Sequence, residues 1–317
     1  MNVDYLRISI TNRCNLRCVY CNPQGDLEAE DGPEILSFEE ICRIARLCSE
    51  CGIAKIRLTG GEPLLRKNVV DLVRKLARID GVEDPSMTTN GVLLAPLAEQ
   101  LKDAGLNRIN VSLDAAKESC YRQMTGCDVL ARVIEGIEKA VEVGLVPVKL
   151  NCVVLKDVNL SQVVPLAEMS LRLPIAVRFI EYCPTSSLTG PADGYVPNEL
   201  VRSRIESQFG RLTDLPAPDS GGPAVYARIQ GAAGTIGFIS GRSSMFCHRC
   251  SRLRLTSDGR LRPCLHVEQA YDVRKLLRDG ATDETVLKLI KRVLREKDAF
   301  TRLDSGNEEF LMQHIGG

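Results

Sequence analysis

Residues 14–21 read Cys-Asn-Leu-Arg-Cys-Val-Tyr-Cys, a CxxxCxxC pattern formed by Cys14, Cys18 and Cys21. Soft thiolates bind both zinc and iron–sulfur clusters, so the triplet alone leaves both kinds of site open. A four-iron cluster held by three thiolates keeps one iron free for a substrate, just as a catalytic zinc keeps a free position. The competing interpretations are a zinc site lacking its fourth ligand and three unrelated cysteines.

This spacing resembles that of the radical S-adenosylmethionine (SAM) superfamily. There the open iron binds the amino and carboxylate groups of the methionine part of SAM, and the reduced cluster cleaves SAM to a 5′-deoxyadenosyl radical. The resemblance implies a [4Fe-4S] cluster and SAM as cofactors, with Tyr20 packed beside the cluster.

Composition indicates an ordinary globular chain. Its 317 residues are 44% apolar, enough for one large α/β domain or for such a domain with an appendage. Lys plus Arg and Asp plus Glu both total 41, so no overall basic charge indicates nucleic acid or an anionic membrane. Neither a membrane span nor a signal peptide is visible. We therefore expect a cytoplasmic protein with no nucleic-acid or membrane partner.

The thirteen cysteines favour metal ligands and reduced thiols over disulfides in a chain of this kind. Six of them lie in two clustered motifs. Cys48 and Cys51 form a further CxxC at the end of a predicted helix, with no other ligand pair nearby. We interpret this pair as free thiols rather than a metal or redox site, and the sequence assigns no role to the pair or to Cys42.

Short β-branched runs alternate with helical patterns through the first 180 residues, which predicts a parallel sheet with right-handed crossovers. Polar signatures, including Thr59-Gly60-Gly61-Glu62-Pro63, follow the ends of these strands, where barrel active sites gather. No glycine-rich dinucleotide motif follows the first strand, so we predict a partial (β/α)6 barrel rather than a doubly wound sheet. The predicted strands are 6–10, 55–59, 86–89, 108–113, 146–154 and 175–180, and the predicted helices are 38–50, 67–79, 93–104, 116–143 and 160–171.

After about residue 182 the sequence becomes rich in turn residues, as in 184–191 and 216–223. We therefore predict a radical SAM barrel over 1–182 and a smaller C-terminal α+β region over 183–317. In that region we expect helices near 197–208, 272–278 and 282–297, and strands near 224–230 and 234–239.

The C-terminal region carries a second thiol motif. Residues 247–256 read Cys-His-Arg-Cys-Ser-Arg-Leu-Arg-Leu-Thr, and Cys264 follows fourteen residues after Cys250. A closed zinc site would need His248, His266 or an outside residue as its fourth ligand. Alone, the motif leaves zinc and iron–sulfur equally open. Beside the first triplet, a second cluster with an open iron, held by Cys247, Cys250 and Cys264, is favoured.

Together the two motifs and the terminal Gly-Gly resemble the MoaA family of GTP 3′,8-cyclases of molybdenum cofactor biosynthesis, over essentially the whole chain. The resemblance implies GTP as substrate, an electron donor as partner and a second [4Fe-4S] cluster that binds guanine; a homodimer is left open. It implies that the radical takes hydrogen from C3′ of GTP and that the resulting carbon radical adds to C8.

The resemblance also assigns residue roles. A triphosphate bound by a chain of zero net charge needs local cations, and the planar fork of arginine suits phosphate oxygens. An alternating strand would point Arg252 and Arg254 to one face beside the thiolates. Glycines let backbone approach SAM, and a carboxylate pairs with its ammonium group. The substrate set is Arg7, Lys55, Arg57, Lys149, Arg178, Arg252 and Arg254; the SAM set is Tyr20, Gly60, Gly61, Glu62, Thr88, Ser112 and Cys183; and the catalytic set is Arg252, Arg254, Gly316 and Gly317.

Three positions depart from the family pattern: Asn22 and Cys183 stand where Met is usual, and Ser251 where Asn is usual. These affect fine contacts, and substrate contacts in 184–196 are not assignable. Two other functions stay open: another radical SAM enzyme with an auxiliary cluster, such as a peptide-modifying one, and a non-enzymatic zinc-binding protein. The first usually has a longer, cysteine-richer C-terminal region, and the second leaves the Gly-Gly-Glu-Pro turn unexplained.

Overall fold

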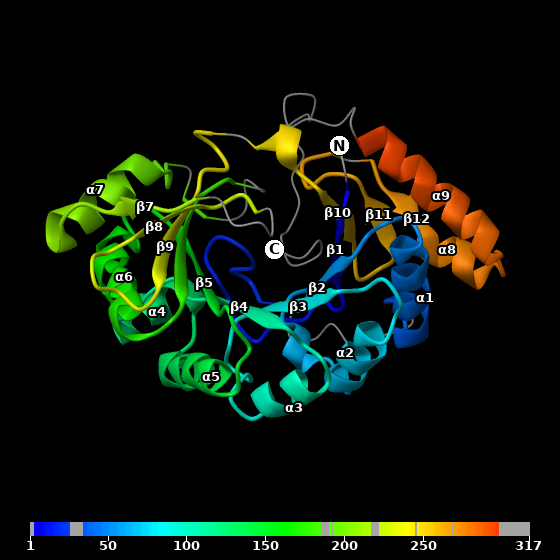
Figure 1. The fold of residues 1–317 in the computed structure, drawn as a ribbon, viewed down its shortest axis with the longest axis horizontal. Coiled ribbons are helices and arrows are strands. Elements are labelled where there is room, and N and C mark those ends of the chain that lie inside the picture. Colours follow the sequence, from blue (N-terminus) through cyan, green and yellow to red (C-terminus); the bar gives the residue numbers. More distant parts are fainter. Residues whose placement is uncertain are drawn as a thin grey trace.

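The computed structural model describes residues 3–25, 34–184, 190–191, 193–216, 222–244, 246–267 and 269–297. Within them a twelve-stranded sheet curves into an open arc, with helices along its outer side (Figure 1). Six parallel strands lie in chain order at its centre, which confirms the predicted partial barrel. They are β1 Tyr5–Ser9, β2 Lys55–Thr59, β3 Asp84–Thr89, β4 Arg108–Ser112, β5 Lys149–Val154 and β6 Ala176–Glu181.

Alternation along the strands separates the core from the inner face of the arc. On β1, Leu6 and Ile8 are fully buried in the apolar core, whereas Tyr5 and Arg7 face the inner cavity. Successive side chains of a strand point to opposite faces, so a single strand serves both surfaces. The inner face is therefore lined by polar strand residues.

Helices follow the strands and cover the outer face. Helix α1, Phe38–Ser49, begins with a capping box, because Ser37 Oγ accepts the Glu40 N–H and Glu40 Oε2 accepts the Ser37 N–H. The remaining elements of this part are η1 Pro63–Leu65, η2 Leu160–Gln162, α2 Val69–Ala77, α3 Ala98–Asp103, α4 Glu118–Thr125, α5 Leu130–Glu142 and α6 Val163–Arg172.

Three sequence predictions in this part were wrong in detail. The helix predicted over 93–104 begins only at Ala98, because residues 93–97 form turns. The stretch 116–143 forms two helices, because Gly126 takes a left-handed conformation (φ 69°) and ends α4 with a hydrogen bond to Arg122 O. The strand predicted from residue 146 begins at Lys149, after Pro147, which has no N–H to donate to a neighbouring strand.

The C-terminal part extends both ends of the central sheet. At one end β9 Thr235–Ile239 pairs in parallel with β6, and at the other β10 Arg252–Leu255 pairs in parallel with β1. The predicted boundary at 182/183 stays a prediction, and the sheet is continuous across it. The other C-terminal elements are β7 Thr213–Asp214, β8 Val225–Arg228, β11 Arg260–Arg262, β12 Tyr271–Asp272, η3 Cys247–Arg249, α7 Asn198–Phe209, α8 Val273–Arg278 and α9 Asp283–Glu296.

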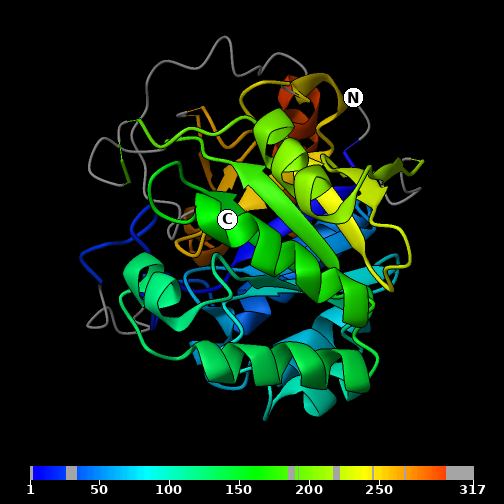
Figure 2. The same cartoon turned by 90° about the vertical axis from the view of Figure 1, so that its left-hand side faces the viewer.

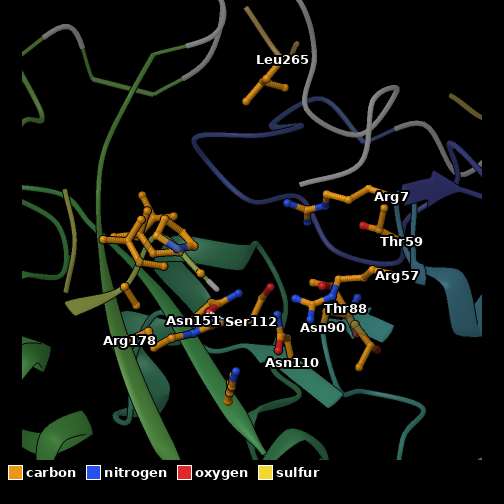
Figure 3. Close-up of a pocket in the computed structure, with 18 of the residues that line it drawn as sticks. Arg7, Arg57, Thr59, Thr88, Asn90, Asn110, Ser112, Asn151, Arg178 and Leu265 are labelled. Atoms are coloured by element: carbon orange, nitrogen blue, oxygen red, sulfur yellow. Dashed lines mark hydrogen bonds between the residues drawn. The ribbon is translucent and has the colours of Figure 1, made fainter. Parts of the chain in front are cut away.

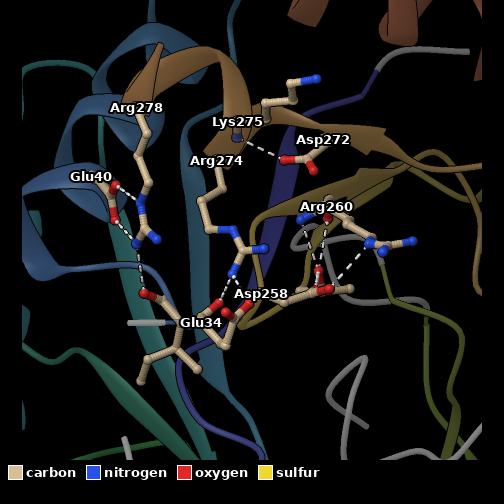
Figure 4. Close-up of polar contacts among 10 residues, drawn as sticks. Glu34, Glu40, Asp258, Arg260, Asp272, Arg274, Lys275 and Arg278 are labelled. Carbon is tan, nitrogen blue, oxygen red and sulfur yellow. Dashed lines mark hydrogen bonds and ion pairs between the residues drawn. The ribbon is translucent and has the colours of Figure 1, made fainter. Parts of the chain in front are cut away.

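The C-terminal helices lie where the sequence predicted them, to within one or two residues. Figure 2, viewed from the side of α6 and α7, shows these two helices on the outside of the strands. Figure 4 shows how α8 joins the segment around α1: Arg278 Nε lies 2.8 Å from Glu40 Oε1, and Arg274 Nη1 lies 3.0 Å from Glu34 Oε2. Such exposed pairs contribute under about 1 kcal/mol each, so they orient α8 more than they stabilise the fold.

None of the helices in the described residues has the length and apolar character needed to cross a bilayer.

Candidate active site

A cavity of about 690 Å³ lies on the inner side of the sheet (Figure 3). This volume suits a small-molecule ligand. The structure brings most of the predicted site residues into its wall. These are Arg7, Cys14, Cys18, Tyr20, Cys21, Lys55, Arg57, Gly60, Gly61, Thr88, Ser112, Lys149, Arg178, Arg252 and Arg254.

The loop 14–21 follows β1 and is docked on the last turn of α4. The Arg17 N–H donates to Thr125 O at 2.8 Å, and the Val19 N–H donates to Met124 O at 2.9 Å. Carbonyls in the last turn of a helix have no partner within that helix, so the loop satisfies acceptors that would otherwise stay open. The three thiols of the loop are thereby fixed at the cavity wall.

Burial alone favours the neutral form of these thiols. Burial raises the pKa of Cys14 to about 11, and burial followed by the nearby Asp114 and Cys21 raises that of Cys18 well above its usual value. A bound cation reverses this by stabilising the thiolates. In the described residues, no three Cys, His, Asp or Glu side chains are grouped so that they could hold a single metal ion. A four-iron cluster does not require such a group, because each of its thiolate ligands binds a different iron.

The Gly60-Gly61 turn packs against the start of this loop. The Gly61 N–H donates to Thr11 O at 2.8 Å, and a Cβ on Gly61 would lie 2.2 Å from Arg13 O. From the sequence, these glycines are expected to let the backbone approach SAM. In the structure the room they leave is filled by the backbone of residues 11–13, although both glycines also line the cavity.

Glu62 is directed into the protein. Its carboxylate is fully buried and accepts hydrogen bonds from Thr89 Oγ1 (2.7 Å), the Asn90 N–H (2.6 Å) and the Leu64 N–H (3.0 Å). Burial raises its pKa to about 7 despite these hydrogen bonds. The structure does not place Glu62 in the cavity wall, and its contact with the ammonium group of SAM stays a prediction.

The hydroxyl of Thr88 in the wall suits a ligand such as SAM. Thr88 Oγ1 is buried without a hydrogen-bond partner in the described residues, and buried hydroxyls normally have one.

Tyr20 donates its hydroxyl to Asp114 Oδ2 at 2.8 Å, while Asp114 Oδ1 accepts the Val153 N–H at 2.8 Å. Asp114 therefore ties the cysteine loop to the ends of β4 and β5, a role that sequence analysis did not assign.

Cations form another part of the wall. The strand register places Arg7 beside both Arg57 of β2 and Arg254 of β10. Burial and the neighbouring Arg252 lower the pKa of Arg254 to about 10, and burial and Arg178 lower that of Lys149 to about 7. Buried groups of like charge destabilise each other's charged forms, and an anion bound beside them would stabilise those forms.

Several polar residues of this wall were not predicted from the sequence. Arg108 forms an ion pair with Asp84, and Lys55 Nζ lies 2.6 Å from Asp4 Oδ2, so carboxylates offset two of the cations. Alternation gave a signal for Arg108, which lies two residues before Asn110 on the same strand. Further wall residues not assigned from the sequence include Asp4, Tyr5, Arg108, Asn110, Asn151, Tyr226 and Arg249.

The second thiol motif borders the same cavity. Its neighbours Phe246, Ser251 and Leu265 line the wall, and the Cys250 N–H closes η3 by donating to Cys247 O at 3.1 Å. Burial opposes ionisation of Cys250, but Arg252 and Lys297 together lower its pKa to about 7. Lys297 Nζ lies 3.9 Å from Cys250 Sγ and also acts on Cys264. A thiolate-stabilising environment suits a metal cluster.

Three further predicted site residues and Asn22 have separate outcomes. Cys183 is half-buried and is not in the cavity wall; its Sγ would lie 3.5 Å from a Cβ on Gly241. Gly316 and Gly317 lie outside the described residues. Asn22, one of the departures from the family pattern, lines the cavity and caps the cysteine loop by accepting the Gly25 N–H at 3.2 Å.

Cys48, near the end of α1, and Cys51, just after it, are not in this wall. Cys48 is fully buried and Cys51 half-buried, and both are free thiols.

Comparison with known proteins agrees with this arrangement. Residues 8–169 match the Radical SAM superfamily, and residues 175–302 match the family Molybdenum Cofactor Synthesis C. The chain is 44% identical to a GTP 3′,8-cyclase of Pelotomaculum thermopropionicum over 99% of this chain and 98% of that one. It is 43% identical to one of Moorella thermoacetica over the same shares.

Solved structures match the fold. SuiB of Streptococcus suis bound to S-adenosylmethionine superimposes with a TM-score of 0.62 at 17% identity, covering 90% of this chain and 68% of SuiB. At this identity the likeness concerns the fold alone. The full-length matches at over 40% identity decide the family. The chain belongs to the GTP 3′,8-cyclase family within the radical SAM superfamily.

Proposed function

We propose that this chain is a radical SAM GTP 3′,8-cyclase, which converts GTP to (8S)-3′,8-cyclo-7,8-dihydroguanosine 5′-triphosphate in the first step of molybdenum cofactor biosynthesis. The observation that carries the proposal is one cavity bordered by both cysteine motifs and lined by seven predicted substrate-binding cations. A radical source and an anion-binding wall in one chamber suit chemistry on a nucleotide.

The residues of the chain supply positioning. Cys14, Cys18 and Cys21 would hold one [4Fe-4S] cluster, and Cys247, Cys250 and Cys264 would hold the other. When bound, the first cluster and SAM supply the radical that starts the reaction. The arginine and lysine side chains bind the triphosphate, and the sheet and cysteine loop surround the ribose and exclude water, so orientation is the main contribution of the protein. An electron donor, a homodimer and a cytoplasmic location remain predictions from the sequence.

The decisive experiment is anaerobic turnover. Full-length protein reconstituted with iron and sulfide should hold about eight irons per chain, by the logic of two four-iron clusters. With SAM, GTP and reductant it should release 5′-deoxyadenosine and a cyclised nucleotide, detected by mass spectrometry. Deoxyadenosine with unchanged GTP would reject the substrate. Zinc without iron in protein purified without oxygen would reject the radical chemistry.

A pH effect follows from Lys149. Because its pKa is lowered to about 7 by burial and by Arg178, the side chain is largely neutral in the free protein above that pH. A triphosphate beside it favours the ammonium form, so binding takes up a proton. We therefore expect GTP affinity to weaken as pH rises from about 6.5 to about 8.5 more steeply in the native protein than in Lys149→Met.

Calorimetry in buffers of different ionisation enthalpy measures that proton uptake directly. The titration of the GTP phosphates is common to both proteins and cancels in the comparison. Equal pH slopes and equal proton uptake in the two proteins would show that Lys149 does not face the triphosphate.

A further inference from the structure

We infer that Asn110 is a positioning residue for the nucleotide phosphates, whose neutral amide oxygen holds Arg57 and Arg178 as a pair without cancelling either charge. The inference rests on the proposed function, because it names a device within the same cavity. Figure 3 shows Asn110 between the two arginines.

The three side chains come from alternate strands of the central sheet. Arg57 lies on β2, Asn110 on β4 and Arg178 on β6, and all three line the cavity. Inward-pointing residues of alternate strands meet in one layer of a barrel, which explains how residues far apart in sequence come together. Each is almost completely buried, with 8%, 2% and 7% of its surface exposed in that order.

The amide of Asn110 bridges the two guanidinium groups. In the amide orientation that satisfies its neighbours, Asn110 Oδ1 accepts hydrogen bonds from Arg178 Nη2 at 2.9 Å and from Arg57 Nη1. An amide oxygen has two lone pairs, so one group serves both donors. The two cations are thereby held around a shared acceptor even though they repel each other.

The other hydrogen-bond acceptors of this pair in the described residues are also neutral side chains: Ser86, Asn151 and Tyr226. Arg57 Nε donates to Ser86 Oγ at 3.2 Å, and Arg178 Nε donates to Asn151 Oδ1 at 2.9 Å. Arg108 on the same inner face is different, because its partner is the carboxylate of Asp84. These hydrogen bonds therefore orient Arg57 and Arg178 without an ion pair to either side chain, although the Asp84 carboxylate, which is ion-paired with Arg108, also attracts Arg57.

Electrostatics agrees with this geometry. Burial lowers the pKa of both arginines, and the charge of Arg57 lowers that of Arg178 further. Arginine nonetheless stays protonated in proteins, so the bridge holds a buried pair of like charges. Two such groups fixed side by side suit the adjacent oxygens of a polyphosphate.

The test uses a substitution that keeps the shape and changes the charge. Asn110→Asp places a carboxylate between the arginines, which satisfies them as an ion pair and removes much of their attraction for phosphate. In the reconstituted full-length enzyme we expect GTP affinity to fall about tenfold or more, while affinity for guanosine changes less than about twofold. KM for GTP should rise in parallel, with kcat at saturation little changed.

Two further variants make the result specific. Asn110→Ala removes the bridge without adding charge and should weaken GTP binding less than Asn110→Asp. It also decides the question if the aspartate variant fails to fold. Asn107→Asp is the matched control, because Asn107 is exposed just before β4. This variant makes the same charge change away from Arg57 and Arg178, so the affinities for GTP and for guanosine should both stay unchanged.

Three outcomes would overturn the inference: GTP affinity unchanged in both Asn110 variants, GTP and guanosine affinity lost equally, or an equal loss in the Asn107 control. Inorganic tripolyphosphate separates this inference from the proposed function. If the native protein binds tripolyphosphate but not GTP, the proposed function fails, and the Asn110 comparison made with tripolyphosphate still decides the inference. If the native protein binds neither, both fail.

Discussion

Replacing Cys18 by serine is expected to abolish SAM cleavage, with 5′-deoxyadenosine formation falling about a thousandfold or more. The loss is this large because removing one member of a catalytic unit costs about as much activity as removing the whole unit. Cys18 is the central thiol of the first triplet and is fixed by the loop docked on α4. A serine hydroxyl is a harder and far less acidic ligand, so the first cluster should not assemble. The reconstituted variant should hold about half the iron of the native protein.

Two matched cysteine variants show whether this loss is specific. Cys51→Ser changes a half-buried thiol on the outer side of the fold and should keep full iron content and activity. Cys250→Ser should lose the other half of the iron, keep measurable 5′-deoxyadenosine formation and lose the cyclised nucleotide. A Cys18→Ser enzyme that still releases 5′-deoxyadenosine at the native rate would contradict the assignment of the first triplet.

Gly61→Ala is expected to destabilise the protein by about 3 kcal/mol and to lower the iron content, because the added Cβ overpacks a backbone contact. That Cβ would lie 2.2 Å from Arg13 O and 2.8 Å from Asn12 O, and backbone has no rotamer with which to move aside. Displacing residues 12–13 also displaces Cys14, which follows them directly. Urea unfolding of the apoprotein and iron analysis after reconstitution measure the two effects separately.

Gly222→Ala is the control for that experiment. A Cβ on Gly222 meets nothing within 4 Å, and this variant should unfold at the same urea concentration as the native protein. A Gly61→Ala protein with a native midpoint and full iron content would show that the loop 11–13 can shift without cost.

The central sheet was predictable because its signals are local. Each of the strands β1 to β6 is a short β-branched run followed by a helical pattern, and polar residues such as Asn110 and Ser112 follow from alternation along one strand. The C-terminal strands were harder. Nothing in the local periodicity of residues 252–255 indicates that they pair with β1, because that contact joins opposite ends of the chain.

The candidate site also has a part that was predictable from local sequence and a part that was not. The cysteines and cations were found because their types and spacings carry chemistry, and their alternation places them on one face. What each polar group contacts could not be predicted. The carboxylate of Glu62 turns inward to Thr89, and Gly61 meets Arg13, because both contacts depend on how separate loops pack after β1 and β2.

The pairing of β10 with β1 sets the order in which the enzyme becomes complete during synthesis. Chains emerge from the ribosome from the N-terminus, so β1 and the first cysteine triplet are exposed long before β10 exists. The wall that joins Arg7 to Arg254 therefore forms only when translation is nearly finished. A truncated chain carries the ligands of the radical-forming cluster but no closed nucleotide chamber, so the topology ties the ability to hold the substrate to a full-length product.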